Sequence, residues 1–532
     1  MLSMLRAAAL AALAVVGAGC QSRPAAPTVS PATVRQAVVL DGSFDDWQAA
    51  PRLFSTGAPD AGPVTGAWAQ GDDAWWYLSL ATRDTVSLQA MPGTLHVLFD
   101  ADDNMRTGGT AYGMAGVDFA IDLSRADKSP PGGNGAGFAL RTVGVDGLGA
   151  VRNPYELGVA SLPTWSADRF ELRLARRGAA DGFGRLGPAV KVQLVFVGAD
   201  SVPRASPAAR YAFRTPAASG GAPLATSLPV GAPGSVRIAQ WNVSEGSFRT
   251  PANHAALLAA VRPDIVLLDE VYEQITDSTL AAFFARPALA ALGEWRFVVA
   301  TSGGRQRTVV AARNRAIRPA AAMAFVRYEH GALDSLRALV PASAHRLVDI
   351  EATAQVSATG AWVDVGGTEV LFVPLDLQSG GYRGNPQDQL RVLQARAIRA
   401  HIVAARRAQG VNTRSGVAPV VIAGDFNAVG SFTSVALLQD SLDTDGSALA
   451  LSHAARLPDH SLFTWQNADA AQFAPGRLDL TLYPDAFFRQ TGGFIFTTED
   501  LSDALLASLG LTRGVFAKTA DHLIVVTDLV RR

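Results

Sequence analysis

The stretch from residue 420 to residue 430 reads VVIAGDFNAVG. Its first four residues form a short apolar run of the kind found in a buried strand. A polar group follows directly, so the strand is predicted to end with Asp425 and Asn427 directed into one small region. Taken alone, these residues are equally compatible with an ordinary turn, because Asp, Gly and Asn are common turn residues.

Similar apolar runs recur through the second half of the chain. Strands are predicted at 236–241, 265–268, 370–377, 478–483 and 523–529. Helices are predicted from Thr250-Pro251 to Pro263 and from Asn385-Pro386 onward, since each start combines a capping residue with a first-turn proline. This alternation predicts a layered α/β domain over residues 235–532.

Polar side chains lie at or beside the ends of these predicted strands. They are Asn242, Glu270, Asp425, Asn427, Asp479, Asp521 and His522. Ligands of α/β domains gather where strands end. Carboxylate and amide oxygens suit a hard divalent ion such as Mg²⁺, whereas the chain has no cysteine here and too few histidines for zinc. Such an ion polarises a phosphoryl oxygen, so the set indicates hydrolysis of a phosphate ester.

Five motifs in order carry a family resemblance. WNVSEG, PDIVLLDEV, VIAGDFN, GRLDLTLY and ADHLIVV resemble the endonuclease/exonuclease/phosphatase superfamily, the fold of deoxyribonuclease I. The resemblance covers about residues 235–532 and implies two packed β-sheets flanked by helices. It also implies a Mg²⁺- or Mn²⁺-dependent hydrolase of a phosphodiester or phosphomonoester, such as a nuclease, a phosphatase or a sphingomyelinase-like enzyme.

The same resemblance implies a role for each residue of the set. Glu270 would be the principal metal ligand, with Asn242 and Asp521 close to the ion. Asp425 would orient or activate the attacking water, and Asn427 would contact the scissile phosphate. His522, held by Asp479, would contact phosphate or transfer a proton.

Two positions depart from the family pattern. Asp376, in PLDLQSGG, stands where many members have a histidine, and Asp269 stands where glutamine is commoner. A carboxylate cannot supply the cationic donor of a histidine, although a protonated or metal-bound carboxylate could serve. The departure leaves open a changed metal stoichiometry, a different substrate, or a catalytically silent domain. Asp376 is nevertheless counted among the catalytic candidates.

The first block, residues 36–214, shows strand-and-turn patterning that predicts an all-β sandwich. VVLDGSFDDWQAAP, GDDAWWYLSLATRD, HVLFDADDNMRTG and GVDFAIDLS resemble the family 9 carbohydrate-binding-module-like sandwich. Trp47, Trp75 and Trp76 could stack on sugar rings or fill the core. The acidic loop with Asp100, Asp102 and Asn104 is either a Ca²⁺ site or a plain turn.

The N-terminal segment MLSMLRAAALAALAVVGAGCQS resembles a bacterial lipoprotein signal over residues 1–20, with Cys20 lipidated. Gly17 departs from the leucine usual in such signals, and a cleaved signal with an incidental cysteine is the alternative. Residues 21–35 read as a tether and 215–234 as a linker, both rich in small residues and proline. The protein is thus predicted to be exported to the bacterial cell envelope, as an outer-membrane or surface lipoprotein.

The charge balance constrains the substrate weakly. With 46 basic and 47 acidic residues, the chain has no overall field that would attract long nucleic acids. Nucleic acid, a nucleotide, a phospholipid headgroup and a sugar or inositol phosphate all stay open, as does a glycan for the sandwich. The rival hypotheses are a surface-tethered glycan-binding protein with a silent second domain and a cell-envelope scaffold. Oligomeric state cannot be read from the sequence.

Overall fold

The computed structural model describes residues 38–55, 62–126, 136–220, 222–243, 250–409 and 417–532. The predicted signal peptide, Cys20 and the tether lie outside these residues. Residues 37–532 form one compact unit. Among the described helices, none is both long and apolar enough to span a membrane.

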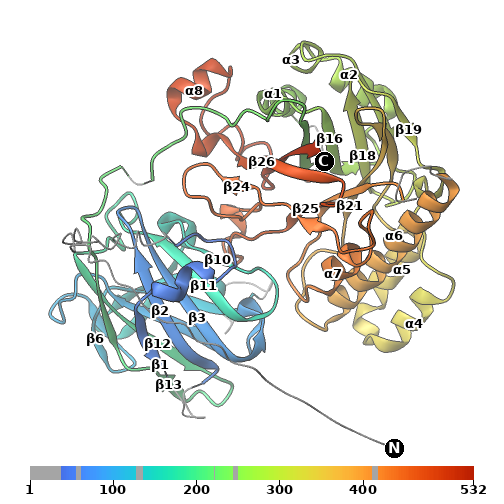
Figure 1. Ribbon diagram of the computed structural model, residues 1–532. Coiled ribbons are helices and arrows are strands. Elements are labelled where there is room, and N and C mark those ends of the chain that lie inside the picture. Colours follow the sequence, from blue (N-terminus) through green and yellow to red (C-terminus); the bar gives the residue numbers. More distant parts are fainter. Residues whose placement is uncertain (1–37, 56–61, 127–135, 221, 244–249, 410–416) are drawn as a thin grey trace, which may run out of the picture. The chain divides into compact units, whose positions relative to one another are not determined.

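Two sheets form the C-terminal α/β region (Figure 1). The first has seven strands in the order β17 (Trp295–Val299), β18 (Gln306–Arg313), β16 (Ile265–Tyr272), β15 (Val236–Asn242), β27 (Ile524–Arg531), β26 (Phe488–Phe496) and β24 (Ala455–Arg456). The second has six, in the order β19 (Ile317–Pro319), β20 (Ala361–Asp364), β21 (Glu369–Asp376), β22 (Val420–Asp425), β25 (Asp479–Tyr483) and β23 (Ala450–Leu451). Every strand predicted in this half is present.

Strand β22 shows how the layers arise. Its side chains alternate, so Val421 and Ala423 join the core cluster between the two sheets. Val420 and Ile422 instead pack in the cluster that contains helix α6 (Pro386–Gln409). On the far side, α1 (Pro251–Val261) and α2 (Asp277–Phe284) pack on the first sheet.

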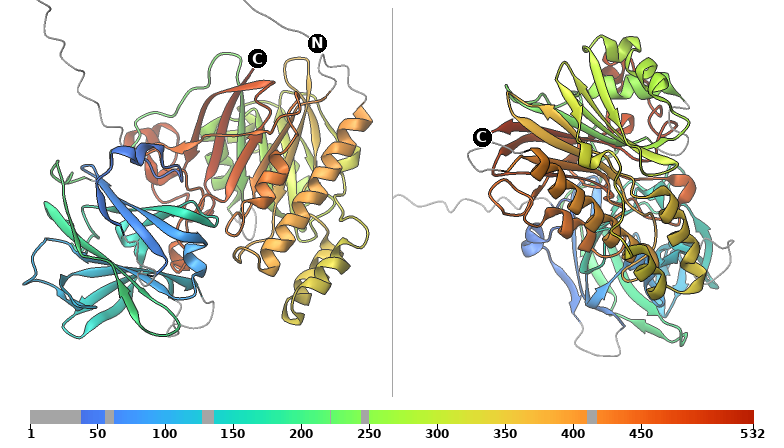
Figure 2. Two further views of the ribbon diagram at one scale, coloured as in Figure 1. Left: turned by 60° about the horizontal axis from the view of Figure 1, so that its bottom comes forward. Right: turned by 90° about the vertical axis from the view of Figure 1, so that its right-hand side faces the viewer.

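The resulting order is helix, sheet, sheet, helix. Figure 2 shows α6 and the shorter α7 (Thr433–Gln439), in orange, alongside the second sheet. This arrangement confirms the predicted layered α/β class.

Gly424 is required where β21 and β22 approach each other. A Cβ at this position would lie 1.9 Å from the carbonyl oxygen of Leu375, and its φ is 150°. Any other residue would push the two strands apart. Gly424 of the GDFN motif therefore allows the ends of β21 and β22 to pack closely side by side.

The N-terminal region is all-β, as predicted. One sheet has the order β1 (Arg52–Ser55), β2 (Val64–Gly71), β3 (Trp75–Val86), β11 (Ala167–Ala175) and β10 (Ala160–Leu162). The other has the order β13 (Pro203–Ala205), β12 (Ala189–Val197), β4 (Thr94–Asp100), β7 (Phe119–Ala126), β8 (Ala136–Gly144) and β9 (Gly147–Arg152), with β14 (Ala209–Ala212) paired to β12.

The aromatic residues of this region mostly fill its interior. Trp76 of one sheet meets Phe99 of the other edge-on, with ring centroids 5.3 Å apart. Trp47 and Trp76 are each only 1% exposed. The Arg173 guanidinium lies over Trp75, with the Arg173 Cζ 4.0 Å from the centroid of the Trp75 ring. The core alternative therefore holds for Trp47 and Trp76, since neither presents a face on which a sugar could stack.

The predicted linker, residues 215–234, contains no helix or strand among its described residues. It is nevertheless bound at several points: the Ala218 N–H donates to the Asp73 carbonyl, and the Ala225 N–H donates to the Asp500 carbonyl. Leu228 packs against the helix side of the first sheet.

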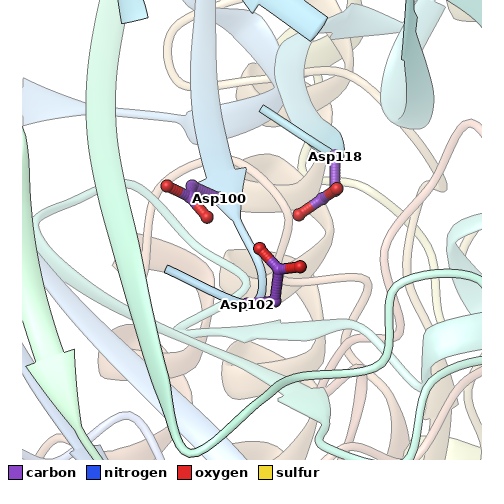
Figure 3. A group of neighbouring side chains, drawn as sticks. All are labelled: Asp100, Asp102 and Asp118. Atoms are coloured by element: carbon purple, nitrogen blue, oxygen red, sulfur yellow. The ribbon is translucent and has the colours of Figure 1, made fainter. Parts of the chain in front are cut away.

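The acidic loop of the sandwich brings three carboxylates together (Figure 3). Oxygens of Asp100, Asp102 and Asp118 lie within 4.8 Å of one another. Asp118, which the sequence did not single out, joins them from the segment before β7. The side-chain oxygen of Asn104, a predicted ligand, accepts the Arg106 N–H at 3.2 Å. Lys191 Nζ lies 3.5 Å from Asp100 and partly balances the charge.

The calcium interpretation of this loop predicts a specific loss of stability. In the parent protein, Ca²⁺ should raise the melting temperature above that in EDTA, because binding to the folded state alone stabilises it. Asp102→Asn should abolish the increase in melting temperature that Ca²⁺ causes and keep any increase that Mg²⁺ causes. Asp168→Asn, on the exposed side of β11, is the control. Equal Ca²⁺ increments in all three proteins, measured by scanning calorimetry, would identify the loop as a plain turn.

Candidate active site

Strand register places three aspartates in a row across the second sheet. Asp376 of β21 pairs with Asp425 of β22, which in turn pairs with Asp479 of β25. In the first sheet, Asn242 of β15 pairs with Asp269 of β16. In both sheets, polar residues at the ends of neighbouring strands therefore lie side by side.

Asn242 connects the two sheets. Its amide Nδ2 lies 3.2 Å from Glu270 Oε1 and 3.4 Å from Asp425 Oδ2. Asn242 is fully buried and Asp425 is 2% exposed. Two of the predicted metal ligands, Asn242 and Glu270, thus share one site with the predicted catalytic carboxylate.

His522 lies between two carboxylates. Its Nδ1 is 2.9 Å from Asp479 Oδ2, and its Nε2 is 3.7 Å from Asp425 Oδ2. Burial alone would lower the pKa of His522, but Asp479 and Asp425 together raise this pKa well above the usual histidine value. The two carboxylates therefore hold the imidazole in one orientation and favour its protonated form, from which Nε2 can donate a hydrogen bond.

Asp425 and Asn427 form a tight local turn. The Asn427 N–H donates to Asp425 Oδ1 at 2.8 Å, and its amide Nδ2 donates to Asp425 Oδ2 at 2.9 Å. The same Nδ2 also donates to the Leu377 carbonyl at 2.8 Å. If this amide nitrogen contacted a phosphate, it would have to give up one of these two hydrogen bonds. Burial raises the pKa of Asp425 to about 7, against the lowering effect of His522. Near neutral pH this carboxyl can both accept and release a proton.

Glu270 leaves the regular strand at a bulge. The register of β16 with β18 shifts between Leu268 and Val271, and Glu270 has a φ of +54°. Such bulges redirect a side chain next to functional sites. Burial raises the pKa of Glu270, His522 opposes this rise, and Asp521 adds to it.

The donor chemistry of this site fits a divalent ion. Glu270, Asp521 and Asn242 are the residues that would hold it, since carboxylate and amide oxygens are the ligands of Mg²⁺ and Mn²⁺. Asp479 and Asp425 lie within 4 Å of His522, and Glu270 and Asp425 act electrostatically on Asp376, so a bound cation would stabilise the ionised forms of these buried carboxyls.

Asp521 is held from outside the sheets. Its Oδ2 accepts the indole N–H of Trp465 at 3.1 Å and the amide of Asn467 at 3.2 Å. The sequence offered no signal for either partner, because both lie in an irregular segment more than 50 residues before Asp521.

Gln240 is a further residue that the sequence analysis missed. Its Nε2 donates to Asp269 Oδ1 at 3.2 Å and to Asp479 Oδ1 at 3.0 Å. Asp269 Oδ2 has no hydrogen-bond partner among the described residues, and burial raises the pKa of this carboxyl well above its usual value. A fully buried glutamine inside an apolar strand is the one sequence signal that could have pointed to it.

Asp376 adds a further acid to the site. It is 8% exposed, and burial, followed by the charges of Glu270 and Asp425, raises its pKa well above the usual range. The loop after it is ordered by buried Arg391, whose Nη1 donates to the carbonyls of Gln378 at 2.8 Å and Gly380 at 2.6 Å. The departure from the family pattern is therefore built into a fixed part of the site.

Comparison with solved structures gives matches at low identity and low TM-score. A humanized TDP2 of D. rerio is 16% identical, with 56% of this chain and 99% of that chain covered and a TM-score of 0.33. The human Nocturnin catalytic domain with bound sulfate is 16% identical, with 57% and 97% covered and a TM-score of 0.32. ANGEL2, a 2',3'-cyclic phosphatase, is 13% identical, with 56% and 95% covered and a TM-score of 0.33.

No curated protein matches the chain. Residues 239–503, however, match the Endonuclease/Exonuclease/phosphatase family. The match spans the strand-end motifs from Asn242 to Asp479 and leaves Asp521 and His522 just beyond its end. The part of this chain from residue 239 to residue 503 is therefore similar to the Endonuclease/Exonuclease/phosphatase family.

Proposed function

We propose that residues 235–532 form a Mg²⁺- or Mn²⁺-dependent phosphoesterase that hydrolyses a phosphodiester or phosphomonoester. The observation that carries this proposal is the chain of contacts from Asp479 through His522 to Asp425, joined by Asn242 to Glu270. It combines a fixed imidazolium, a carboxyl with a pKa of about 7 and oxygen ligands for a cation.

Each group has a separate task in this proposal. The bound ion would polarise a phosphoryl oxygen and stabilise the leaving oxygen. Asp425 accepts the proton of the attacking water, and His522 donates a hydrogen bond to the phosphoryl group as negative charge develops. Asp479 accepts a hydrogen bond from Nδ1 of His522 and so fixes the orientation of the ring. Asn427 holds Asp425 in place and offers its amide to the phosphate.

The charge balance bears on the substrate, and the start of the chain bears on the location. A nucleotide, a phospholipid headgroup or a sugar phosphate suits the balanced charge better than a long nucleic acid does. The lipoprotein-like start supports action in the cell envelope, with the membrane reached through lipid on Cys20. Radiolabelled palmitate that fails to appear on the protein would contradict the anchor.

Removal of the Asp425 carboxyl or of the His522 imidazole should lower turnover strongly. Asp425→Ala and His522→Ala should each lower metal-dependent hydrolysis of bis-p-nitrophenyl phosphate by about 10²- to 10⁴-fold, because each removes a proton-transfer or charge-stabilising group. Asp503→Ala is the control, since its carboxylate on the surface of α8 (Asp503–Ser508) is 89% exposed. Equal rates in all variants would point to a contaminant, and binding of polysaccharide without any turnover would favour the glycan-binding rival.

The buried carboxyl of Asp425 predicts a pH dependence of stability. Its pKa rises from 3.8 to about 7 on folding, so between these values the folded protein binds a proton that the unfolded chain releases. In EDTA, the free energy of unfolding should therefore fall as pH rises through this window and lose no more from this group above about 7. Urea unfolding across the range measures the slope. Asp425→Asn should flatten it, and an unchanged slope would assign the effect to other groups.

Asp376→His tests the departure from the family pattern. The substitution removes one carboxylate from beside Glu270 and supplies a cationic donor, so we expect about a tenfold gain in kcat on bis-p-nitrophenyl phosphate, the size of one charge-assisted hydrogen bond. Asp376→Asn is the control that removes only the charge. A drop in kcat for both variants would instead show that the chain uses the Asp376 carboxylate.

A further inference from the structure

The segment 464–478, here named the bridging segment, runs between β24 and β25 and contacts both regions of the chain. It contains one short helical turn, Ala468–Ala470. Just before it, Asp459 forms a buried ion pair with Arg173 of the sandwich strand β11. A buried pair of this kind resists separation, because either partner alone would be an uncompensated charge.

On the sandwich side, the bridging segment is held by specific hydrogen bonds. The Tyr155 hydroxyl accepts the Asn467 N–H at 3.0 Å and donates to the Phe473 carbonyl at 3.2 Å. The amide of Asn153 donates to the Ala468 carbonyl at 2.9 Å. Gln89 donates to the Gln472 carbonyl at 2.9 Å. Side chains of the sandwich thus bind both ends of the helical turn.

On the active-site side, the same segment binds Asp521 through side chain and backbone. Trp465 Nε1 and Asn467 Nδ2 both donate to Asp521 Oδ2, and the Gln466 N–H donates to the Asp521 carbonyl at 3.0 Å. Asn467 is therefore held by Tyr155 at its backbone and holds Asp521 with its side chain.

We propose that the N-terminal sandwich is part of the metal centre's support, with Tyr155 acting as a positioning residue for Asp521 through Asn467. The proposal rests on the proposed role of Asp521 near the cation. The orientation of a metal ligand is commonly set by hydrogen bonds from residues that do not themselves touch the metal. Loss of these hydrogen bonds weakens metal binding. Here that support comes from a different part of the chain, more than 300 residues before Asp521 in sequence.

The alternative is that these hydrogen bonds only join the two regions. The two cases differ in what Tyr155→Phe changes. A positioning role alters the affinity for the cation, whereas a purely adhesive role alters stability alone. Tyr112→Phe is the matched control, because this sandwich tyrosine donates or accepts one hydrogen bond with His96 Nε2 at 3.1 Å.

The experiment measures Mn²⁺ binding to the full chain by electron paramagnetic resonance of the free ion, with the melting temperature in EDTA beside it. The relevant site is the one that Glu270→Ala abolishes. Tyr155→Phe should weaken Mn²⁺ binding at that site by about three- to tenfold, the effect of losing about one hydrogen bond, while Tyr112→Phe leaves it unchanged. Asn467→Ala should weaken it at least as much, and the double variant should add little.

Three results would overturn the proposal: identical Mn²⁺ affinities in the two tyrosine variants, a Tyr155→Phe effect confined to the melting temperature in EDTA, or a parent protein with no Mn²⁺ site that depends on Glu270. Failure of the phosphoesterase proposal has a different signature. In that case the parent would bind Mn²⁺ in a Tyr155-dependent way and yet hydrolyse no phosphate ester.

Discussion

The structure depends on one electrostatic constraint: several carboxylates are buried around a single imidazole. Among the residues that the structure describes, His522 is the one basic side chain that lies within ion-pair distance of both Asp479 and Asp425. A buried charge is costly unless it is paired, so each further carboxyl at this edge must bind a proton or a cation. Burial raises the pKa of Asp425, Glu270, Asp376 and Asp269, so without a cation these carboxyls favour the protonated, neutral form.

The backbone brings these groups together with few degrees of freedom. Gly424 lets β21 and β22 run close enough for Asp376 and Asp425 to share a register position, and the bulge at Glu270 turns a carboxylate out of its strand. Both features sit in core strands rather than in loops. Rigid strand ends hold a site more accurately than loops do, which matters where a small displacement lowers the rate strongly.

Much of this arrangement could be predicted from the sequence, because strands and helices follow from local periodicity. The strand that ends in Asp425, the capped helix α6 and the polar groups at the strand ends all belong to this class. What escaped prediction depends on contacts between distant segments. Gln240 meets Asp479 across 239 residues, Trp465 reaches Asp521 from an irregular segment, and Asp118 joins its loop only through the sheet pairing of the sandwich.

Contacts between distant segments also involve the N-terminal region. Its resemblance suggested a glycan-binding module, yet Trp47 and Trp76 are core residues, and Trp75 is covered by Arg173. Three polar side chains of the sandwich, Tyr155, Asn153 and Gln89, are engaged with residues 467–474 of the bridging segment. Because the bridging segment also binds Asp521, a change in the sandwich contacts alters the surroundings of a carboxylate at the centre of the charge imbalance. The sandwich is thereby coupled to the site through hydrogen bonds, and a ligand for it is not needed to explain why the two regions occur in one chain.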